Sequence, residues 1–513
     1  MKLSRILGAG LLALTTLVGG CGASPGTGKI AINATAASSS AGLGNQTITI
    51  ARSSDITSLN PQELNIGEDY ETQQALYAGL VRTSADGKTI EGDLASSWSF
   101  DERTLTYTFK LRGGLEFSNG APITAADVTY SIEYAAKGVE YAPLFSAISA
   151  VTTPAPDEIK VKLSRYSNLL LPGLAFAFVL PHNLNGEKPL DFFKDPVSSG
   201  EYSLVSWSPN SQMVLAANPH YWDPGAVLTK HIVFQTIAEE NARLDALQAG
   251  NVQLDEYVPD EQVAALPSDQ LLLSNPRASL VFLETNNGRP PFNNISDREA
   301  AALAIDRRLI LKTIWRAGVP SQGLLPPGLE DSHPTPTGSE AWEYDPTKAK
   351  AILAGTHPTV TLLASYERGI DSKLVDVLQQ ELEQVGFHVT VDVRDFASAV
   401  TQLLSGNFSF FLSPQSAFLP TVGEPITTYL TLAAPGAHWN TSLLAGYLNR
   451  FSLAKTLAGR RQAGIEFERW AHSQWVASPV GNPGVYFGID KDLRGLSVQP
   501  FGTYRLGSLQ IPR

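Results

Sequence analysis

The sequence predicts an α/β protein that is divided into two or three lobes. Residues 359–364 (TVTLLA) read as a strand, residues 371–385 repeat apolar side chains at helical spacing, and residues 387–391 return as a second strand. A strand, a helix and a strand in that order place the two strands in parallel on one sheet. The chain of 513 residues also exceeds the size at which a single hydrophobic core stops growing. These observations predict the fold class and its division into lobes.

The chain begins with the three-part pattern of an export signal. Residues 1–5 are basic, residues 6–18 are mostly apolar, and two glycines precede Cys21. An apolar helix of about a dozen residues rises about 20 Å, which is too short to cross about 30 Å of hydrocarbon. Residues 18–21 resemble a bacterial lipobox, and Cys21 is the one cysteine of the chain. We therefore expect residues 1–20 to be a signal peptide and Cys21 to be lipidated; a plain secretory signal is the alternative.

The composition restricts what the mature chain can bind and what stabilises it. Its formal net charge of −12 falls to about −14 when Lys2 and Arg5 leave with the signal peptide. An acidic surface argues against nucleic acid and against adhesion to anionic lipid headgroups. A single cysteine forms no intramolecular disulfide, so the stability of the fold must come from buried area. Residues 169–180 form the longest later apolar run, and Pro172-Gly173 interrupts it, so no membrane-spanning helix is expected.

The first third of the chain contains a tether and three strands. Residues 21–44 are rich in Gly, Ala, Ser and Thr without an apolar period, which is typical of a flexible tether. Residues 47–51, 105–111 and 158–163 each alternate polar with apolar side chains, and we predict a strand at each.

Three local patterns predict where helices begin or end. Thr124 followed by Asp127 predicts a helix N-cap with an acidic first turn. Residues 296–299 have the sequence of a capping box and predict a helix over residues 300–305. Gly386 follows the apolar helical repeat of residues 371–385 and is expected to cap that helix.

Several segments resemble, in the same order, the family 5 extracellular solute-binding proteins, which are the peptide and nickel-type receptors of ABC importers. Residues 107–112 read YTFKLR, as in the family, and residues 116–128, EFSNGAPITAADV, resemble its FHDGTPLTAEDV motif. The other matching segments are residues 76–81, 93–98, 196–207, 218–222, 247–254, 291–292, 304–308 and 344–350. Each motif is short, and the resemblance rests on their shared order.

The resemblance implies a type II periplasmic-binding-protein-like fold, in which two large α/β lobes are joined by a hinge and a smaller third lobe is added. Carried over to this chain, lobe I comprises residues 45–80, 196–276 and 477–513, lobe II comprises residues 81–195, and lobe III comprises residues 277–476. Two hinged lobes can close around a solute and bury it without any covalent chemistry.

The resemblance also implies where a ligand binds. In peptide-binding members, the backbone of an extended ligand bonds to a segment from each lobe. The first segment corresponds to residues 55–57, and the second precedes the pair Glu424-Pro425. Many peptide receptors have a carboxylate three residues before that pair, which holds the ligand's amino group, whereas this chain has Thr421 there. A hydroxyl cannot replace a buried negative charge that faces an ammonium group.

The candidate ligand-binding residues are Asp55, Ile56, Thr57, Phe418, Leu419, Thr421, Glu424 and Trp439. For three of them a structural role is the open alternative. Asp55 also suits a turn or strand end, Glu424 a solvated loop, and Trp439 the packing of a core.

The resemblance implies a peptide or peptide-like ligand, ABC permease subunits as membrane partners, and a monomeric, exported cell-envelope lipoprotein on the periplasmic or outer-surface face of the membrane. No cofactor, catalytic residue or metal site is predicted, because the eight histidines are scattered without ligand spacing and no phosphate-binding Gly-x-x-x-x-Gly-Lys-Ser/Thr loop occurs. Two alternatives stay open: a non-peptide ligand such as a metal chelate, opine, sugar or haem, and a non-transporting envelope or signalling lipoprotein.

Overall fold

The computed structural model describes residues 47–63, 67–274, 279–321, 323–332, 342–366, 370–499 and 502–512. All of them belong to the unit formed by Asn45–Arg513. Cys21, the expected signal peptide and the expected tether lie outside the described residues.

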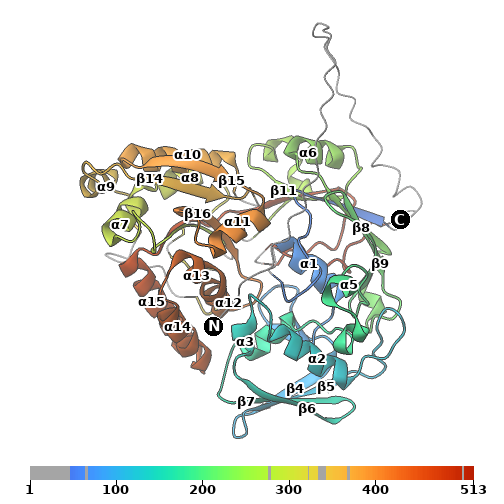
Figure 1. The fold of residues 1–513 in the computed structure, drawn as a ribbon. Helices are drawn as coiled ribbons and strands as arrows, with labels where there is room; N and C mark the ends of the chain where they lie inside the picture. Colours follow the sequence, from blue (N-terminus) through green and yellow to red (C-terminus); the bar gives the residue numbers. More distant parts are fainter. Residues whose placement is uncertain are drawn as a thin grey trace, which may run out of the picture. The chain divides into compact units, whose positions relative to one another are not determined.

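The first large sheet has the strand order β12-β18-β11-β1-β10-β9-β8. Figure 1 labels its strands β11, β9 and β8. Its strands are β1 (Thr47–Arg52), β8 (Tyr202–Ser208), β9 (Gln212–Ala217), β10 (His231–Thr236), β11 (Leu254–Val258), β12 (Leu271–Leu273) and β18 (Tyr486–Ile489). The central strand β1 confirms the first predicted strand and is parallel to both β10 and β11. Helix α1 (Gly67–Leu76) follows β1, and α6 (Glu240–Gln248) packs on β11.

The second large sheet has the order β15-β14-β16-β13-β17. Its strands are β13 (Ser279–Thr285), β14 (Thr359–Ala364), β15 (His388–Val393), β16 (Phe410–Ser416) and β17 (Ala477–Gly481). Its helices are α7 (Ile295–Ala304), α8 (Arg307–Thr313), α9 (Pro346–Ile352), α10 (Ser372–Val385), α11 (Phe396–Leu404), α12 (Gly423–Thr428), the π-helix η9 (Tyr429–Ala433), α13 (Ala434–Ala437), α14 (Thr441–Leu453) and α15 (Leu457–Gln474). Strands β14 and β15 pair in parallel across α10, as the sequence predicts.

In the sequence, the small sheets lie between β1 and β8, two strands of the first large sheet. A four-stranded sheet has the order β4-β5-β7-β6, and β2 pairs with β3. These strands are β2 (Val81–Thr83), β3 (Ile90–Gly92), β4 (Ala95–Asp101), β5 (Thr106–Leu111), β6 (Ile148–Ala155) and β7 (Glu158–Leu163), and the associated helices are α2 (Ala125–Ala135), α3 (Ala142–Phe145), α4 (Leu170–Gly173) and α5 (Pro189–Phe192). Strands β5 and β7 confirm two of the predicted strands, and α2 packs on β6 and β7.

Of the three predicted helix boundaries, two are confirmed and one is wrong. Asp127 accepts hydrogen bonds from the backbone N and the Oγ1 of Thr124, at 2.7 and 2.6 Å, which confirms that cap. Gly386 ends α10 with a φ of +121°, as expected of a glycine cap. The start of α7 was predicted wrongly: it begins at Ile295, because the Asn294 side chain accepts from the backbone N of Ser296 and caps the helix earlier.

The chain crosses between the two large sheets twice. It leaves the first sheet after β12 to enter β13, and it returns after β17 to enter β18. The two crossings are bonded to each other: the N of Ser274 donates to the carbonyl of Val485 at 2.8 Å, and Ser279 Oγ donates to the carbonyl of Pro483 at 3.0 Å. Two short crossing segments of this kind form a hinge between the lobes.

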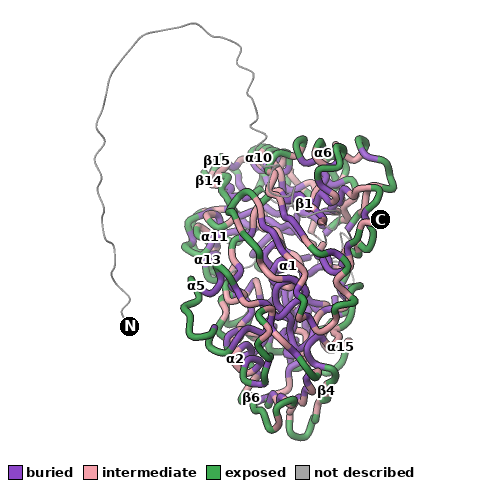
Figure 2. Tube along the Cα trace, turned by 90° about the vertical axis from the view of Figure 1, so that its right-hand side faces the viewer, coloured by how far each residue is buried: buried purple, intermediate pink, exposed green. Residues whose placement is uncertain are grey.

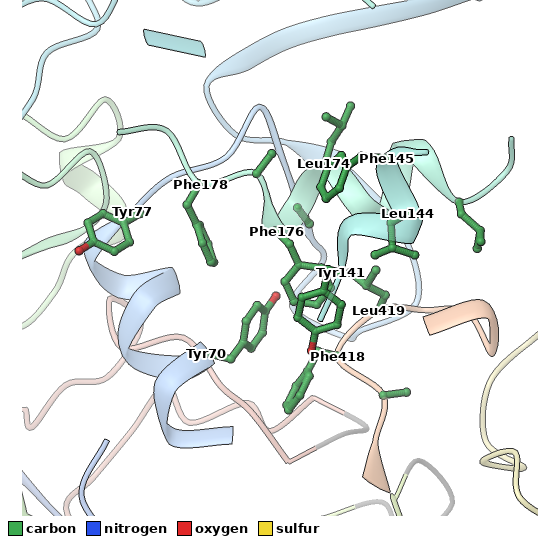
Figure 3. Packing of buried hydrophobic residues seen from close by; sticks show 14 of the residues in the cluster. Tyr70, Tyr77, Tyr141, Leu144, Phe145, Leu174, Phe176, Phe178, Phe418 and Leu419 are labelled. Atoms are coloured by element: carbon green, nitrogen blue, oxygen red, sulfur yellow. The ribbon is translucent and has the colours of Figure 1, made fainter. Parts of the chain in front are cut away.

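The residues of β1 and α1 are mostly buried (Figure 2). Beside the hinge, an aromatic cluster joins α1 to the small lobe and to the segment after β16 (Figure 3). The ring of Tyr70 lies 5.0 Å from that of Phe418 and 5.2 Å from that of Phe176. Segments far apart in the sequence therefore share one apolar core next to the cleft described below.

Candidate functional site

A cleft of about 670 Å³ lies between the two large sheets. One wall is the loop after β1 with the start of α1, and the facing wall is residues 393–397, between β15 and α11. Hinge residues form part of its lining, among them Ser274, Ser279, Pro483 and Val485. Its volume falls within the range of about 300–1,000 Å³ that is typical of sites for small ligands.

The loop after β1 is held in place by its own hydrogen bonds. Asp55 Oδ2 accepts from the indole N of Trp207 at 2.9 Å and from the backbone N of Asn210 at 2.7 Å. The N and Oγ1 of Thr57 both donate to the carboxylate of Asp69, which is buried at the start of α1. The predicted residues Asp55, Ile56 and Thr57 therefore form a fixed wall of the cleft.

The Asp55 contact with Trp207 yields a test of how firmly this wall must be held. Trp207→Phe removes the donor to Asp55 and keeps an aromatic ring, so we expect binding of the tripeptide Ala-Phe-Ala to weaken by about three- to tenfold, the usual effect of one hydrogen bond. Isothermal titration calorimetry would measure this. Trp98→Phe, at a half-buried tryptophan of the four-stranded sheet, is the control and should bind as the wild type does.

Hydroxyl groups dominate the polar lining of the cleft. The lining includes Ser53, Ser54, Thr57, Thr236, Ser274, Ser279, Ser365, Ser416 and Thr503. A hydroxyl can both donate and accept hydrogen bonds, so this lining suits a ligand with many polar groups. The charged residues of the described lining are Asp55, Glu68, Arg394 and Asp395.

The facing wall contributes one cation and a helix N-terminus. The Arg394 guanidinium is exposed, and its Nε lies 2.9 Å from Asp392 Oδ2. Asp395 caps α11 by accepting a hydrogen bond from the backbone N of Ser398 at 2.9 Å. Hydrogen bonds from the side chain and the backbone of Ser398 lower the pKa of the Asp395 carboxyl. Sequence reasoning did not find this wall. The sequence did contain a signal for this wall: it follows the carboxyl end of the predicted parallel strand β15, and ligands of α/β sheets commonly bind at that end.

Phe418 lines the cleft, and the neighbouring Leu419 and Glu424 support it from the core. Glu424 is fully buried in α12, and its Oε2 accepts from the backbone N of Phe418 at 2.7 Å and of Leu419 at 3.1 Å. Burial raises the pKa of this carboxyl well above its ordinary value. Glu424 is thus neither a solvated loop acid nor part of the cleft lining, and it holds the backbone of the wall.

Thr421 and Trp439 also lie in the core. Thr421 Oγ1 donates to Asp331 Oδ2 at 2.7 Å, and the backbone N of Val422 donates to Asp331 Oδ1 at 2.9 Å. Trp439 is buried, and its ring packs 6.1 Å from that of Tyr429. Of the eight candidate residues, Asp55, Ile56, Thr57 and Phe418 line the cleft, whereas Leu419, Thr421, Glu424 and Trp439 are buried outside its lining.

Two further features of the described residues concern membrane insertion and metal binding. None of their helices is both long and apolar enough to span a membrane. Within the same part of the chain, His, Cys, Asp and Glu side chains form no group of three or more that could hold a metal ion.

Comparison with known proteins places the chain in a family. Residues 89–436 match the model of the bacterial extracellular solute-binding proteins, family 5. The glutathione-binding protein GsiB of Escherichia coli is 28% identical over 386 residues, which cover 72% of this chain and 74% of that protein.

Solved structures share the fold. A dipeptide-binding protein from Pseudoalteromonas sp. SM9913, in complex with Met-Leu, superposes with a TM-score of 0.84 at 18% identity, over 91% of this chain and all of the other. The binding protein AgaA of A. tumefaciens, in complex with agropinic acid, gives 0.80 at 23% identity, over 91% of this chain and 99% of the other. These similarities confirm the type II fold, with two large lobes and a smaller third. The chain belongs to the bacterial extracellular solute-binding proteins, family 5, the receptors of ABC importers.

Proposed function

We propose that this chain is a lipid-anchored extracytoplasmic receptor that binds peptides or peptide-like solutes in the cleft and delivers them to an ABC permease. The observation that carries the proposal is the cleft of about 670 Å³ between two lobes that are joined by two crossing segments. GsiB is named for glutathione, and the Pseudoalteromonas protein holds a dipeptide, which supports a peptide-like ligand.

Closure around the ligand would be the signal to the permease. Residues 45–80, 196–276 and 477–513 would form one lobe, with residues 81–195 attached to it, and residues 277–476 would form the other. The chain would act as a monomer and would leave the solute chemically unchanged. A ligand shifts the population toward the closed form only if it binds that form more tightly.

The residues proposed to contact the ligand are Asp55, Ile56, Thr57 and Phe418. Leu419, Thr421, Glu424 and Trp439 would act indirectly, by supporting the cleft wall. Because Thr421 is buried against Asp331, we propose that this position does not bind the amino group of the ligand. Binding should therefore tolerate a blocked amino terminus.

Calorimetry with Ala-Phe-Ala and its N-acetylated form tests both points. We expect saturable binding of both peptides, with affinities within about tenfold of each other, since no paired charge is lost on acetylation. A preference of more than a hundredfold for the free amine would contradict the expected tolerance and would assign the amino group to a carboxylate of the cleft lining, Asp55, Glu68 or Asp395. Native mass spectrometry of protein purified from its own host, with no peptide co-purifying and no peptide bound in solution, would overturn the peptide proposal.

A non-peptide ligand is the second candidate, because the AgaA structure holds agropinic acid in the same fold. The same mass spectrometry discriminates between the two, since the mass of a co-purifying molecule identifies its class.

The anchor is tested separately at Cys21. Cys21→Ser should move the protein from the membrane fraction to the soluble fraction, because stable attachment needs lipid chains and the acidic chain has no other affinity for the bilayer. Immunoblotting of the two fractions measures the change, with Ser24→Ala as the control. Retention of Cys21→Ser in the membrane fraction would contradict the anchor.

A further inference from the structure

A second cavity of about 130 Å³, here called the side pocket, adjoins the cleft. Five residues line both cavities: Gly67, Phe396, Pro414, Ser416 and Phe418. A ligand that lies in the cleft can therefore extend one group into the side pocket without leaving the cleft.

The walls of the side pocket are mostly apolar and come mainly from four elements. Phe282 and Phe411 project from the paired strands β13 and β16, Val400 and Leu403 from α11, and Leu432 from η9. The first four of these side chains are buried, which fixes the walls before any ligand arrives. A fixed apolar pocket favours an apolar group, because that group leaves water without displacing any polar contact.

The size of the side pocket matches one side chain. An apolar cavity of about 150 Å³ is known to accept a benzene molecule. The side pocket, at about 130 Å³, is close to this size, so it suits one aromatic or branched aliphatic group and is too small for a second residue of a peptide.

Three polar side chains of the side pocket are already bonded within the protein. Thr428 Oγ1 donates to Glu140 Oε1 at 3.4 Å, and Gln415 Nε2 donates to the carbonyl of Ser416 at 3.0 Å. The hydroxyl of Tyr429 donates to the carbonyl of Leu324. Glu140 is the one charged residue of the described lining, so a cationic side chain is the competitor that an experiment must exclude.

From this geometry we infer that the side pocket is a specificity subsite that accepts one apolar side chain of the ligand, aromatic or branched aliphatic. The inference rests on the proposed function, because it requires a ligand in the cleft. It extends that function by naming the class of side chain that the receptor selects.

A tripeptide series on the wild-type protein tests the inference without any variant. Calorimetry should find Ala-Phe-Ala and Ala-Leu-Ala bound at least tenfold more tightly than Ala-Ala-Ala, as burial of a large apolar side chain predicts. Equal affinities for all three would overturn the inference and leave the proposed function standing. Tighter binding of Ala-Lys-Ala would overturn it in favour of a cation held by Glu140. Absence of binding by every tripeptide would overturn the proposed function and the inference with it.

A matched pair of variants in η9 locates the preference. Leu432 lines the side pocket, whereas Leu430, two residues earlier and also half-buried, does not. Leu432→Gln should weaken Ala-Phe-Ala binding about tenfold, toward the affinity of Ala-Ala-Ala, and Leu430→Gln should keep the preference. Thermal unfolding checks that both variants are folded. An equal loss of preference in both variants, or in neither, would overturn the assignment of the subsite.

Discussion

Replacement of Arg52 by methionine is expected to lower the free energy of unfolding by about 3–5 kcal/mol, the cost of removing one partner from a buried ion pair. Arg52 is 2% exposed at the end of β1. Its Nη2 lies 3.0 Å from Glu71 Oε2 in α1, and its Nε lies 3.1 Å from Glu256 Oε2 in β11. The guanidinium also stacks over the ring of Phe234, 3.4 Å from its centroid.

The expected loss comes from the two acids that remain. Glu71 and Glu256 are each 1% exposed, and removal of Arg52 takes away the cation that lies between these two carboxylates in a medium of low polarity. Thr72 Oγ1 accepts a hydrogen bond from Arg52 Nη1, and the hydroxyl of Tyr504 donates to Glu256 Oε1. The network therefore attaches α1, β11 and the C-terminal segment to β1. The loop that carries Asp55 begins directly after Arg52, and the network thereby also fixes the base of the cleft wall.

Urea unfolding of the ligand-free protein measures this effect, and two further proteins control it. Arg394→Met removes an exposed arginine from its pair with Asp392 and should cost less than about 1 kcal/mol. Adding Glu71→Gln and Glu256→Gln to Arg52→Met should recover a large part of the lost stability, because it removes the two buried negative charges that Arg52 faced. A loss for Arg52→Met no larger than that for Arg394→Met would show that water or another group compensates the acids.

The parts of the fold that the sequence predicted are those that local contacts determine. Strands β14 and β15 and the helix between them follow from side-chain periods alone, and the φ of +121° at Gly386 is a conformation that favours glycine. The start of α7 was missed because Asn294 and Ser296 are both good capping residues a few positions apart, and the sequence does not say which of them caps.

The site was predictable only in part, because the direction of side chains after β16 depends on residues far away in the chain. Asp331, which lies 90 residues before Thr421 in the sequence, draws that hydroxyl into the core. Glu424 turns inward to the backbone of Phe418, so of that stretch Phe418 alone among the candidate residues is left on the cleft. Neither bond has a local sequence signal. The loop at residues 55–57 was found because it directly follows a strand that the alternation pattern already locates.

Replacement of Glu381 by glutamine is expected to raise the free energy of unfolding by about 3 kcal/mol above pH 7 and to change it little below pH 4. Glu381 lies on the buried face of α10, and burial raises the pKa of its carboxyl from 4.5 to about 7. The nearby Asp306 carboxylate raises this pKa further, whereas the backbone N of Asp306, which donates to Glu381, and the charge of Arg307 lower it.

The direction in which stability changes with pH follows from whether the folded or the unfolded state holds the proton of Glu381. Between pH 4.5 and about 7 the folded protein keeps Glu381 protonated while the unfolded chain has released that proton, so stability falls as the pH rises through this window. Each pKa unit corresponds to about 1.4 kcal/mol, which gives a total of about 3 kcal/mol. Glutamine has the same size and does not titrate, so the free energy of unfolding of the variant lacks the fall of about 3 kcal/mol that Glu381 causes in the wild type.

Urea unfolding of both proteins at a series of pH values from just below 4 to 8 measures the difference. Other buried acids with raised pKa values, such as Glu284 and Glu424, contribute to both curves and cancel. Glu383→Gln is the matched control, because Glu383 lies on the same helix two residues later and is exposed, so its curve should run parallel to that of the wild type. A Glu381→Gln curve that also ran parallel to that of the wild type would contradict the prediction. It would mean that Glu381 is ionised in the folded protein at neutral pH and that the charge of Arg307 compensates its burial.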